Sequence, residues 1–178
     1  AQSLWLEYVL NPDQVIEKDL FQMIKNLFDN ESDYALLSEM ISLPSEQILH
    51  QNVGKIDVQE VHNQRNQSIL SVANAFKDEL LELYYQLNTP KAFDLSTQSI
   101  GERAIKNKCL SYLSKLGEYD IAYQQFINAE CMTDQFGAFQ CLLDSENRYR
   151  AEIITQFYNQ HQSDVQVMDK WFSAQCIA

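Results

Sequence analysis

The chain has 178 residues, and 25 Asp and Glu side chains against 13 Lys and Arg give it a formal net charge of −12. Hydrophobic residues make up 46% of the sequence, which is typical of a globular protein and argues against wholesale disorder. The excess negative charge argues against nucleic acid as a partner, because phosphate contacts need a basic surface. The longest apolar run, Tyr34 to Leu37, is far below the roughly 20 residues of a membrane-spanning helix, so we also expect no membrane partner.

The first helices are indicated by a start signal and a periodic stripe. Residues 11–13 read Asn-Pro-Asp, in which Asn can cap, Pro suits the first helical position and Asp favours the positive end of the helix dipole. Hydrophobic residues then recur every three or four positions over 15–28, which predicts an amphipathic helix. A second helix is expected over 34–42, and a short helical turn over 46–50, capped by Ser45.

The longest predicted helix begins at Asp57 and runs to about Leu87. Hydrophobic residues recur along it at helical spacing: Val58, Val61, Ile69, Val72, Phe76, Leu80, Leu83 and Leu87. Pro90 prevents the helix from continuing. Arg65 lies on this stripe, where an apolar residue is expected. We interpret it as a guanidinium paired with a carboxylate of a neighbouring helix, and the functional alternative is contact with a carboxylate of a partner or substrate.

The second half of the chain has regular helix boundaries. Ser99 and Glu102 match an S-x-x-E capping box, which predicts a helix that ends at Gly117 in the left-handed conformation. Four further helices are predicted, over 118–130 and from Thr133, Ser145 and Asp164 onward.

These boundaries predict an all-α fold. Helices of about 12 to 17 residues joined by short turns pack as antiparallel neighbours. Successive hairpins with a period of about 30 residues predict stacked antiparallel helix pairs that form an α-solenoid, a HEAT-like superhelix. The chain has only four Gly and three Pro, too few for a sheet protein rich in hairpins. No low-complexity linker divides it, so we expect one helical domain over 1–178.

We predict no catalytic, cofactor-binding or metal-ligating residue in this chain. None of the three His residues has a second His four positions on, as the zinc motif H-E-x-x-H requires. The four Cys residues contain no C-x-x-C pair, which favours reduced thiols in a cytoplasmic protein over a zinc site or a disulfide framework: Cys109, Cys131, Cys141 and Cys176.

Other residues suggest chemistry only weakly. Four acidic residues could be combined into general acid and base pairs, but on helices such residues normally form solvated faces: Glu79, Glu82, Glu118 and Asp120. Five aromatic residues could line a ligand groove, although aromatic residues at helical spacing more often belong to a core: Trp5, Tyr84, Tyr85, Trp171 and Phe172.

Three segments together resemble a known family. They read ERAIKNKCLSYL at 102–113, NAECMTD at 128–134 and VMDKWF at 167–172. Their order and spacing resemble the C-terminal helical domain of bacterial aminopeptidase N, the zinc-dependent alanyl aminopeptidase of the gluzincin class. The resemblance covers roughly Leu36 to Gln175 and is specific in its last 75 residues.

The resemblance implies a supporting role. In that family the catalytic domain lies N-terminal to this region and carries H-E-x-x-H and G-A-M-E-N, neither of which occurs here. No catalytic or zinc-binding residue therefore carries over, and zinc belongs to the parent enzyme. The family's helical domain continues beyond a position like Ala178, so the chain is expected to be an incomplete piece of it. This domain walls off the active-site chamber, and its partners are the catalytic domain of the same polypeptide and the peptide substrates.

We therefore expect a parent enzyme that releases N-terminal amino acids from peptides, and a fragment that is inactive on its own. The alternative is a free-standing helical-repeat adaptor that binds a protein partner on its concave face. The predicted final helix carries Val165, Met168, Trp171, Phe172 and Cys176. Solenoid ends normally have polar capping helices, so we expect self-association through this helix.

Overall fold

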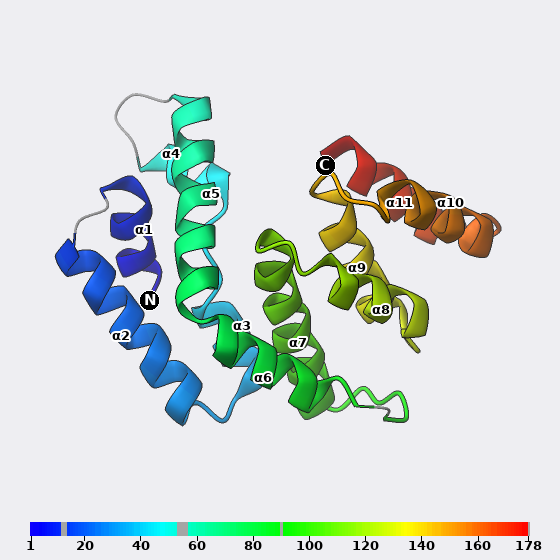
Figure 1. Cartoon of the computed structure of the whole chain (residues 1–178), viewed down its shortest axis with the longest axis horizontal. Coiled ribbons are helices and arrows are strands. Elements are labelled where there is room, and N and C mark those ends of the chain that lie inside the picture. The colour runs from blue at the N-terminus through cyan, green and yellow to red at the C-terminus, as the bar shows by residue number, and fades with distance from the viewer. Residues whose placement is uncertain (12–13, 53–56, 90, 178) are drawn as a thin grey trace.

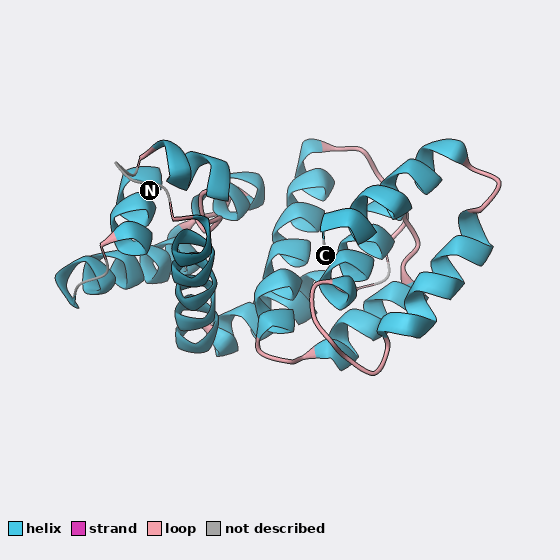
Figure 2. Ribbon diagram, turned by 90° about the horizontal axis from the view of Figure 1, so that it is seen from above, coloured by secondary structure: helices cyan, strands magenta, loops and turns pink. Residues whose placement is uncertain are grey.

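The computed structural model describes residues 1–11, 14–52, 57–89 and 91–177. Within these ranges every regular element is a helix, as Figures 1 and 2 show, and the predicted all-α solenoid is confirmed. The helices are α1 (Gln2–Leu10), α2 (Gln14–Asn30), α3 (Tyr34–Met40), α4 (Glu46–Gln51), α5 (Val58–Ala75), α6 (Lys77–Leu87), α7 (Thr97–Lys115), α8 (Tyr119–Asn128), α9 (Met132–Leu143), α10 (Arg150–His161) and α11 (Val165–Ile177). None of them is both long and apolar enough to cross a membrane.

Side-chain caps fix where several helices begin. Ser45 Oγ accepts from the Ile48 amide at the start of α4, and Asp57 accepts from the Glu60 amide at the start of α5, as predicted. Asp164 Oδ1 likewise accepts from two backbone amides in the first turn of α11. The start signal at 11–13 lies partly outside the described residues, and so does Pro90.

Two predicted helix starts are wrong. The helix α7 begins at Thr97, because Ser96 Oγ caps it by accepting from the Ser99 amide. Glu102, the expected second member of a capping box, forms an ion pair with Lys91 at 2.8 Å instead. The helix α10 begins at Arg150, several residues after Ser145. The helix α1 was not predicted at all.

The long helix expected over 57–87 is also wrong, because it is two helices. Phe76, with φ −117° and ψ 24°, separates α5 from α6. The helical hydrogen bonds continue across it, from the Phe76 amide to Val72 O and from the Leu80 amide to Phe76 O. The break is therefore a bend within a continuous stripe.

Gly117 ends α7 in the predicted left-handed conformation, with φ 88°. The Glu118 amide donates to Leu113 O at 3.2 Å and the Gly117 amide donates to Ser114 O at 3.1 Å. This pair of bonds is the Schellman motif, which turns the chain sharply into α8.

The core is organised around α7, which packs against α3, α5, α6, α8 and α9. The buried hydrophobic residues form a main cluster to which α1–α3 and α5–α10 contribute, and Leu49 of α4 belongs to a smaller second cluster with Val9 and Val61. Two buried hydrogen bonds join distant segments, since Trp5 Nε1 donates to Met40 O at 2.9 Å and the Tyr112 hydroxyl donates to Ile41 O at 2.5 Å. The middle of the chain is thereby a rigid support for the side chains on α7.

Candidate functional site

The four acidic residues that could form acid and base pairs are not brought together. Glu79 pairs with Lys25 at 2.9 Å and Glu118 pairs with Lys77 at 2.5 Å. Asp120 pairs with Arg148 at 2.7 Å, and Glu82 is exposed on α6. Each pair ties one element to another, and exposed ion pairs of this kind are ordinary surface features.

The histidines and cysteines are dispersed too. His62 Nδ1 lies 2.8 Å from Glu46 Oε1, and His161 Nε2 lies 2.9 Å from Gln135 Oε1. All four cysteines are free. Across residues 1–11, 14–52, 57–89 and 91–177, no three His, Cys, Asp or Glu side chains are grouped so that they could hold a metal ion.

The aromatic residues divide between core and surface. Trp5 and Tyr84 are almost completely buried, so they belong to the core. Tyr85 and Phe172 are each 58% exposed and point away from it. The Trp171 indole is half-buried and donates to Ile154 O at 3.2 Å, which fixes α11 to α10. They therefore do not line one shared groove.

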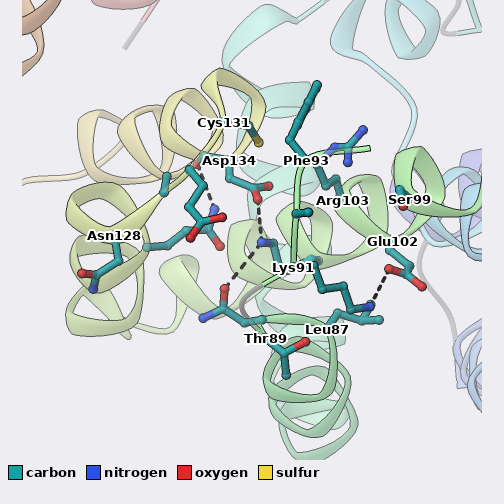
Figure 3. Close-up of a pocket in the computed structure, with 16 residues that line it drawn as sticks. Leu87, Thr89, Lys91, Phe93, Ser99, Glu102, Arg103, Asn128, Cys131 and Asp134 are labelled. Carbon is teal, nitrogen blue, oxygen red and sulfur yellow. Dashed lines mark hydrogen bonds and ion pairs between the residues drawn. The ribbon is translucent and has the colours of Figure 1, made fainter. Parts of the chain in front are cut away.

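A small polar pocket lies where the segment after α6 meets α7 and the α8–α9 connection (Figure 3). Its volume is about 200 Å³. Charged and amide side chains line it, among them Lys91, Glu102, Arg103, Lys106, Gln125 and Asp134.

A buried ion pair forms the floor of this pocket. Lys106 Nζ lies 2.7 Å from Asp134 Oδ2, and both residues are only 8% exposed (Figure 3). Asn107 Nδ2 donates to Asp134 Oδ1 at 2.8 Å, and Gln125 Nε2 donates to Asn107 Oδ1 at 2.7 Å. Asp134 also lies in the first turn of α9, where the helix dipole favours a carboxylate. The charges are thus satisfied by their own neighbours.

This network joins three helices rather than presenting a reactive group. Gln125 Nε2 also donates to the Asp134 carbonyl at 2.9 Å, so α7, α8 and α9 meet in one set of hydrogen bonds. Gly137 makes room for it, because a Cβ there would lie 2.7 Å from Asn107 Oδ1. Within this network Gln125 Oε1 is buried without a hydrogen-bond partner. Such an arrangement positions helices and leaves no activated nucleophile or base.

The rim of the pocket is held by exposed contacts. Lys91 pairs with Glu102, and the Arg103 guanidinium lies 5.1 Å from the centre of the Phe93 ring. Asp94 accepts hydrogen bonds from the Ser96 hydroxyl and amide and from the Ser99 hydroxyl at 2.9 Å. These hydrogen bonds lower the pKa of Asp94 to about 2, and the bond from the Ser96 hydroxyl has the largest effect.

Arg65 does not form the expected pair with a carboxylate. Its Nε donates to the Pro44 carbonyl at 2.9 Å, which joins α5 to the segment before α4. The rest of its guanidinium lines an open groove between α5 and α7. Arg65 therefore contacts a neighbouring segment, as predicted, but the acceptor is a backbone carbonyl and not the expected carboxylate.

The residues that sequence reasoning missed are Lys106 and Asp134. Both lie inside the segments 102–113 and 128–134 that carry the family resemblance. The local signal is weak. Buried residues lie around much of the circumference of α7, so a charged residue such as Lys106, next to Ile105, is also partly buried. Nothing in the sequence shows that its partner lies 28 residues further along.

Comparisons with known proteins give consistent results. A family model described as "Domain of unknown function (DUF3458_C) ARM repeats" matches residues 1–178. Proteins named Aminopeptidase N are similar to the chain: that of Haemophilus influenzae is 28% identical over 147 residues (82% of this chain, 17% of that protein), that of Escherichia coli 28% over 161 (88% and 18%), and that of Caulobacter vibrioides 24% over 168 (92% and 20%). The predicted resemblance to aminopeptidase N is thereby confirmed.

The chain spans about a fifth of the length of these relatives. A crystal structure of Legionella pneumophila aminopeptidase A in complex with aspartic acid has a similar fold, with a TM-score of 0.81. The match covers 99% of this chain and 22% of that chain at 23% sequence identity.

Proposed function

The chain belongs to the DUF3458_C family of ARM repeats, and on this premise we propose that it is the non-catalytic C-terminal helical domain of a zinc-dependent aminopeptidase N. The parent enzyme would release N-terminal amino acids from peptides. The observation that carries this proposal is the 28% identity to two proteins named Aminopeptidase N over more than four fifths of the chain. We place the zinc in the parent, because the described His, Cys, Asp and Glu side chains do not form a group that fits a metal ion.

The role that we propose for the domain, 1–178, is to wall off the active-site chamber. A solenoid supports this role, because it holds side chains on rigid elements along an extended surface. The network of Lys106, Asp134, Asn107 and Gln125 adds to that rigidity by locking α7, α8 and α9 together. The partners on this account are the catalytic domain of the same polypeptide and the peptides that enter the chamber.

We further propose that the protein acts in the cytoplasm, with its cysteines reduced. Burial raises the pKa of Cys109 to about 12 and that of Cys141 to about 11, so both remain protonated thiols at neutral pH. Thiols of this kind behave as small hydrophobic groups and resist oxidation.

The gene that encodes this chain tests the proposal. We expect the same reading frame, several hundred residues upstream, to encode H-E-x-x-H with a distal Glu ligand and a G-A-M-E-N segment. A reading frame that lacks both motifs would contradict the proposal and favour a free-standing helical-repeat adaptor.

The chamber role has its own test in the full-length enzyme. We expect steady hydrolysis of alanyl-p-nitroanilide and of alanyl tetrapeptides, and no release of Ala from the N-terminus of a folded protein that exposes it. Equal kcat/KM values for the tetrapeptide and the folded protein would contradict a closed chamber while leaving the aminopeptidase assignment in place.

A further inference from the structure

A second, larger cavity lies between the N-terminal helices and the central helix. It is a groove of about 690 Å³ lined by residues of α4, α5, α7, α9 and α11 and of the segments before α4 and after α9. Its charged and titratable lining comprises Arg65, Lys108 and Lys115 with His62, Glu46 and Asp144. In Figure 1, α5 and α7 face each other across this part of the molecule.

The acidic residues of the groove already have partners on its wall. Glu46 Oε1 lies 2.8 Å from His62 Nδ1, and Asp144 Oδ2 lies 2.5 Å from Lys115 Nζ. His62 is held on its other side by Asn66, whose Nδ2 lies 2.8 Å from His62 Nε2. These contacts leave none of the lining carboxylates paired with the remaining two cations.

Those two cations are Lys108 and Arg65. In the part of the chain that the structure describes, the Lys108 ammonium forms no ion pair or hydrogen bond, and Arg65 bonds only through Nε to the Pro44 carbonyl. The planar fork of terminal nitrogens on Arg65 is therefore available to an acceptor in the groove. A chain with a net charge of −12 thus keeps, in one cavity, two cations that form no ion pair within the described residues.

Lys108 is also partly removed from water. Burial lowers its pKa from the ordinary value, the nearby Glu39 carboxylate opposes that shift, and the Arg65 guanidinium adds to it. A partly desolvated ammonium beside a guanidinium is stabilised by an anion that contacts both, so the groove favours a negatively charged ligand.

We propose that this groove is a binding site for a carboxylate-bearing ligand, with Lys108 and Arg65 as its two cationic contacts. The carboxylate would accept from the terminal nitrogens of Arg65 and from Lys108 Nζ, which are charge-assisted hydrogen bonds. A monoanionic carboxylate suits the site better than a phosphate dianion, because Glu39, Glu46 and Asp144 lie around it and repel a second negative charge. The C-terminus of a peptide and a small free carboxylic acid share this chemistry.

Titration of the 178-residue chain tests the site, with two-dimensional NMR of the backbone amides of α5 and α7 as the readout. The probes are Ala-Ala-Ala-Ala with a free C-terminus, the same peptide amidated, sodium propionate as a small monocarboxylate, and inorganic phosphate. Saturable shifts with the free-acid peptide or with propionate support the site and identify the source. Equal binding of the free and amidated peptides, tighter binding of phosphate than of either carboxylate, or no saturable shift with any probe overturns it.

The variants separate a site from a general charge effect. We expect Lys108→Gln to weaken binding of the carboxylate probe at least tenfold, because it removes one charge-assisted hydrogen bond and nothing that holds the fold. Lys18→Gln removes the same charge from the exposed face of α2 and should leave the affinity unchanged within twofold. Equal weakening by both variants, or none by Lys108→Gln, contradicts the proposal. The readout is binding rather than turnover, so its outcome is independent of the aminopeptidase assignment.

Discussion

At the scale of single residues, the buried ion pair between Lys106 and Asp134 is the most consequential interaction outside the hydrophobic core. Both charges are buried and paired with each other; Asn107 Nδ2 also donates to the Asp134 carboxylate, and Lys106 Nζ also donates to Asn88 Oδ1 at 3.5 Å. Removing one partner of such a pair leaves the other charge buried without compensation, which costs more than the pair itself contributes.

Lys106→Ala should therefore lower the free energy of unfolding by about 3 kcal/mol, measured by urea denaturation at pH 7. Lys91→Ala is the matched control, because it breaks an ion pair on the rim of the same pocket in which Lys91 is exposed. It should cost less than about 1 kcal/mol. Equal decreases in the free energy of unfolding for the two variants would show that the buried Lys106–Asp134 pair stabilises the fold no more than an exposed pair does.

Asp94 provides a pH-dependent test at the start of α7. Its pKa is about 2 in the folded chain, whereas the ordinary value is 3.8. The ionised carboxylate therefore contributes fully to the stability of the folded state above about pH 4, and this contribution is lost as the pH falls toward 2. We expect a ¹³C NMR titration of the Asp94 carboxyl to give a pKa near 2, and Ser96→Ala to raise it toward 3.8. A pKa unaffected by Ser96→Ala would contradict the proposed cause.

Sequence reasoning succeeds and fails at this scale for a clear reason. The sequence predicts Ser45 as a cap and Asp57 and Asp164 as helix starts, and these predictions hold because each side chain bonds to an amide only two or three residues ahead. The capping box predicted at Ser99 and Glu102 is wrong, because Ser96 caps the helix and Glu102 pairs with Lys91, a contact that the S-x-x-E pattern does not contain. The partner of Arg65 is a backbone carbonyl, which composition cannot single out.

At the scale of elements, the close packing of α7 on α3 depends on a missing side chain. A Cβ on Gly101 would lie 2.9 Å from the backbone nitrogen of Ala35, which cannot move without shifting α3. The backbones of α7 and α3 therefore approach so closely at this point that there is no room for a side chain larger than that of glycine.

Gly101→Ala should destabilise the protein by about 1 to 3 kcal/mol, measured by urea denaturation, although Ala is the better helix former by about 1 kcal/mol. Thr155→Ala on the exposed face of α10 is the control for propensity alone and should be neutral or slightly stabilising. An increase in stability from Gly101→Ala would mean that the packing has room that the structure does not show.

The bend at Phe76 shows why a periodic stripe overestimates helix length. The stripe continues through Phe76, because the bend keeps the hydrogen bonds from the Phe76 amide to Val72 O and from the Leu80 amide to Phe76 O, and Val72, Phe76 and Leu80 are all buried. The ring of Phe76 packs against Phe21 and Phe28, with centroids 5.6 and 5.8 Å away. These contacts with α2 are made between residues about 50 positions apart, so they leave no local signal in the sequence.

At the scale of the whole molecule, the sequence predicts the all-α solenoid, because that follows from the spacing of hydrophobic residues and the scarcity of Gly and Pro. It does not predict the polar pocket or the groove. Lys106 meets Asp134 across 28 residues, and Arg65 and Lys108 belong to helices that only the fold brings together. Cavities depend on such long-range juxtapositions and therefore need the structure.

The last helix carries a prediction about association. Val165 and Phe172 are 74% and 58% exposed on α11, and Tyr158 on the adjacent α10 is 41% exposed. We propose that this apolar surface pairs with a second copy at high concentration, so light scattering after gel filtration should show a mass that rises with concentration. Phe172→Ser should reduce that rise, and a strictly monomeric wild-type chain at millimolar concentration would refute the association.

The central claim is that these helices are a scaffold and that the chemistry of the parent enzyme resides outside them. The direct measurement is the zinc content and the alanyl-p-nitroanilide hydrolysis of the pure 178-residue chain after incubation with zinc and desalting, with the full-length enzyme as the active reference. We predict substoichiometric zinc and no hydrolysis above the buffer rate. One zinc per chain together with turnover would contradict the account.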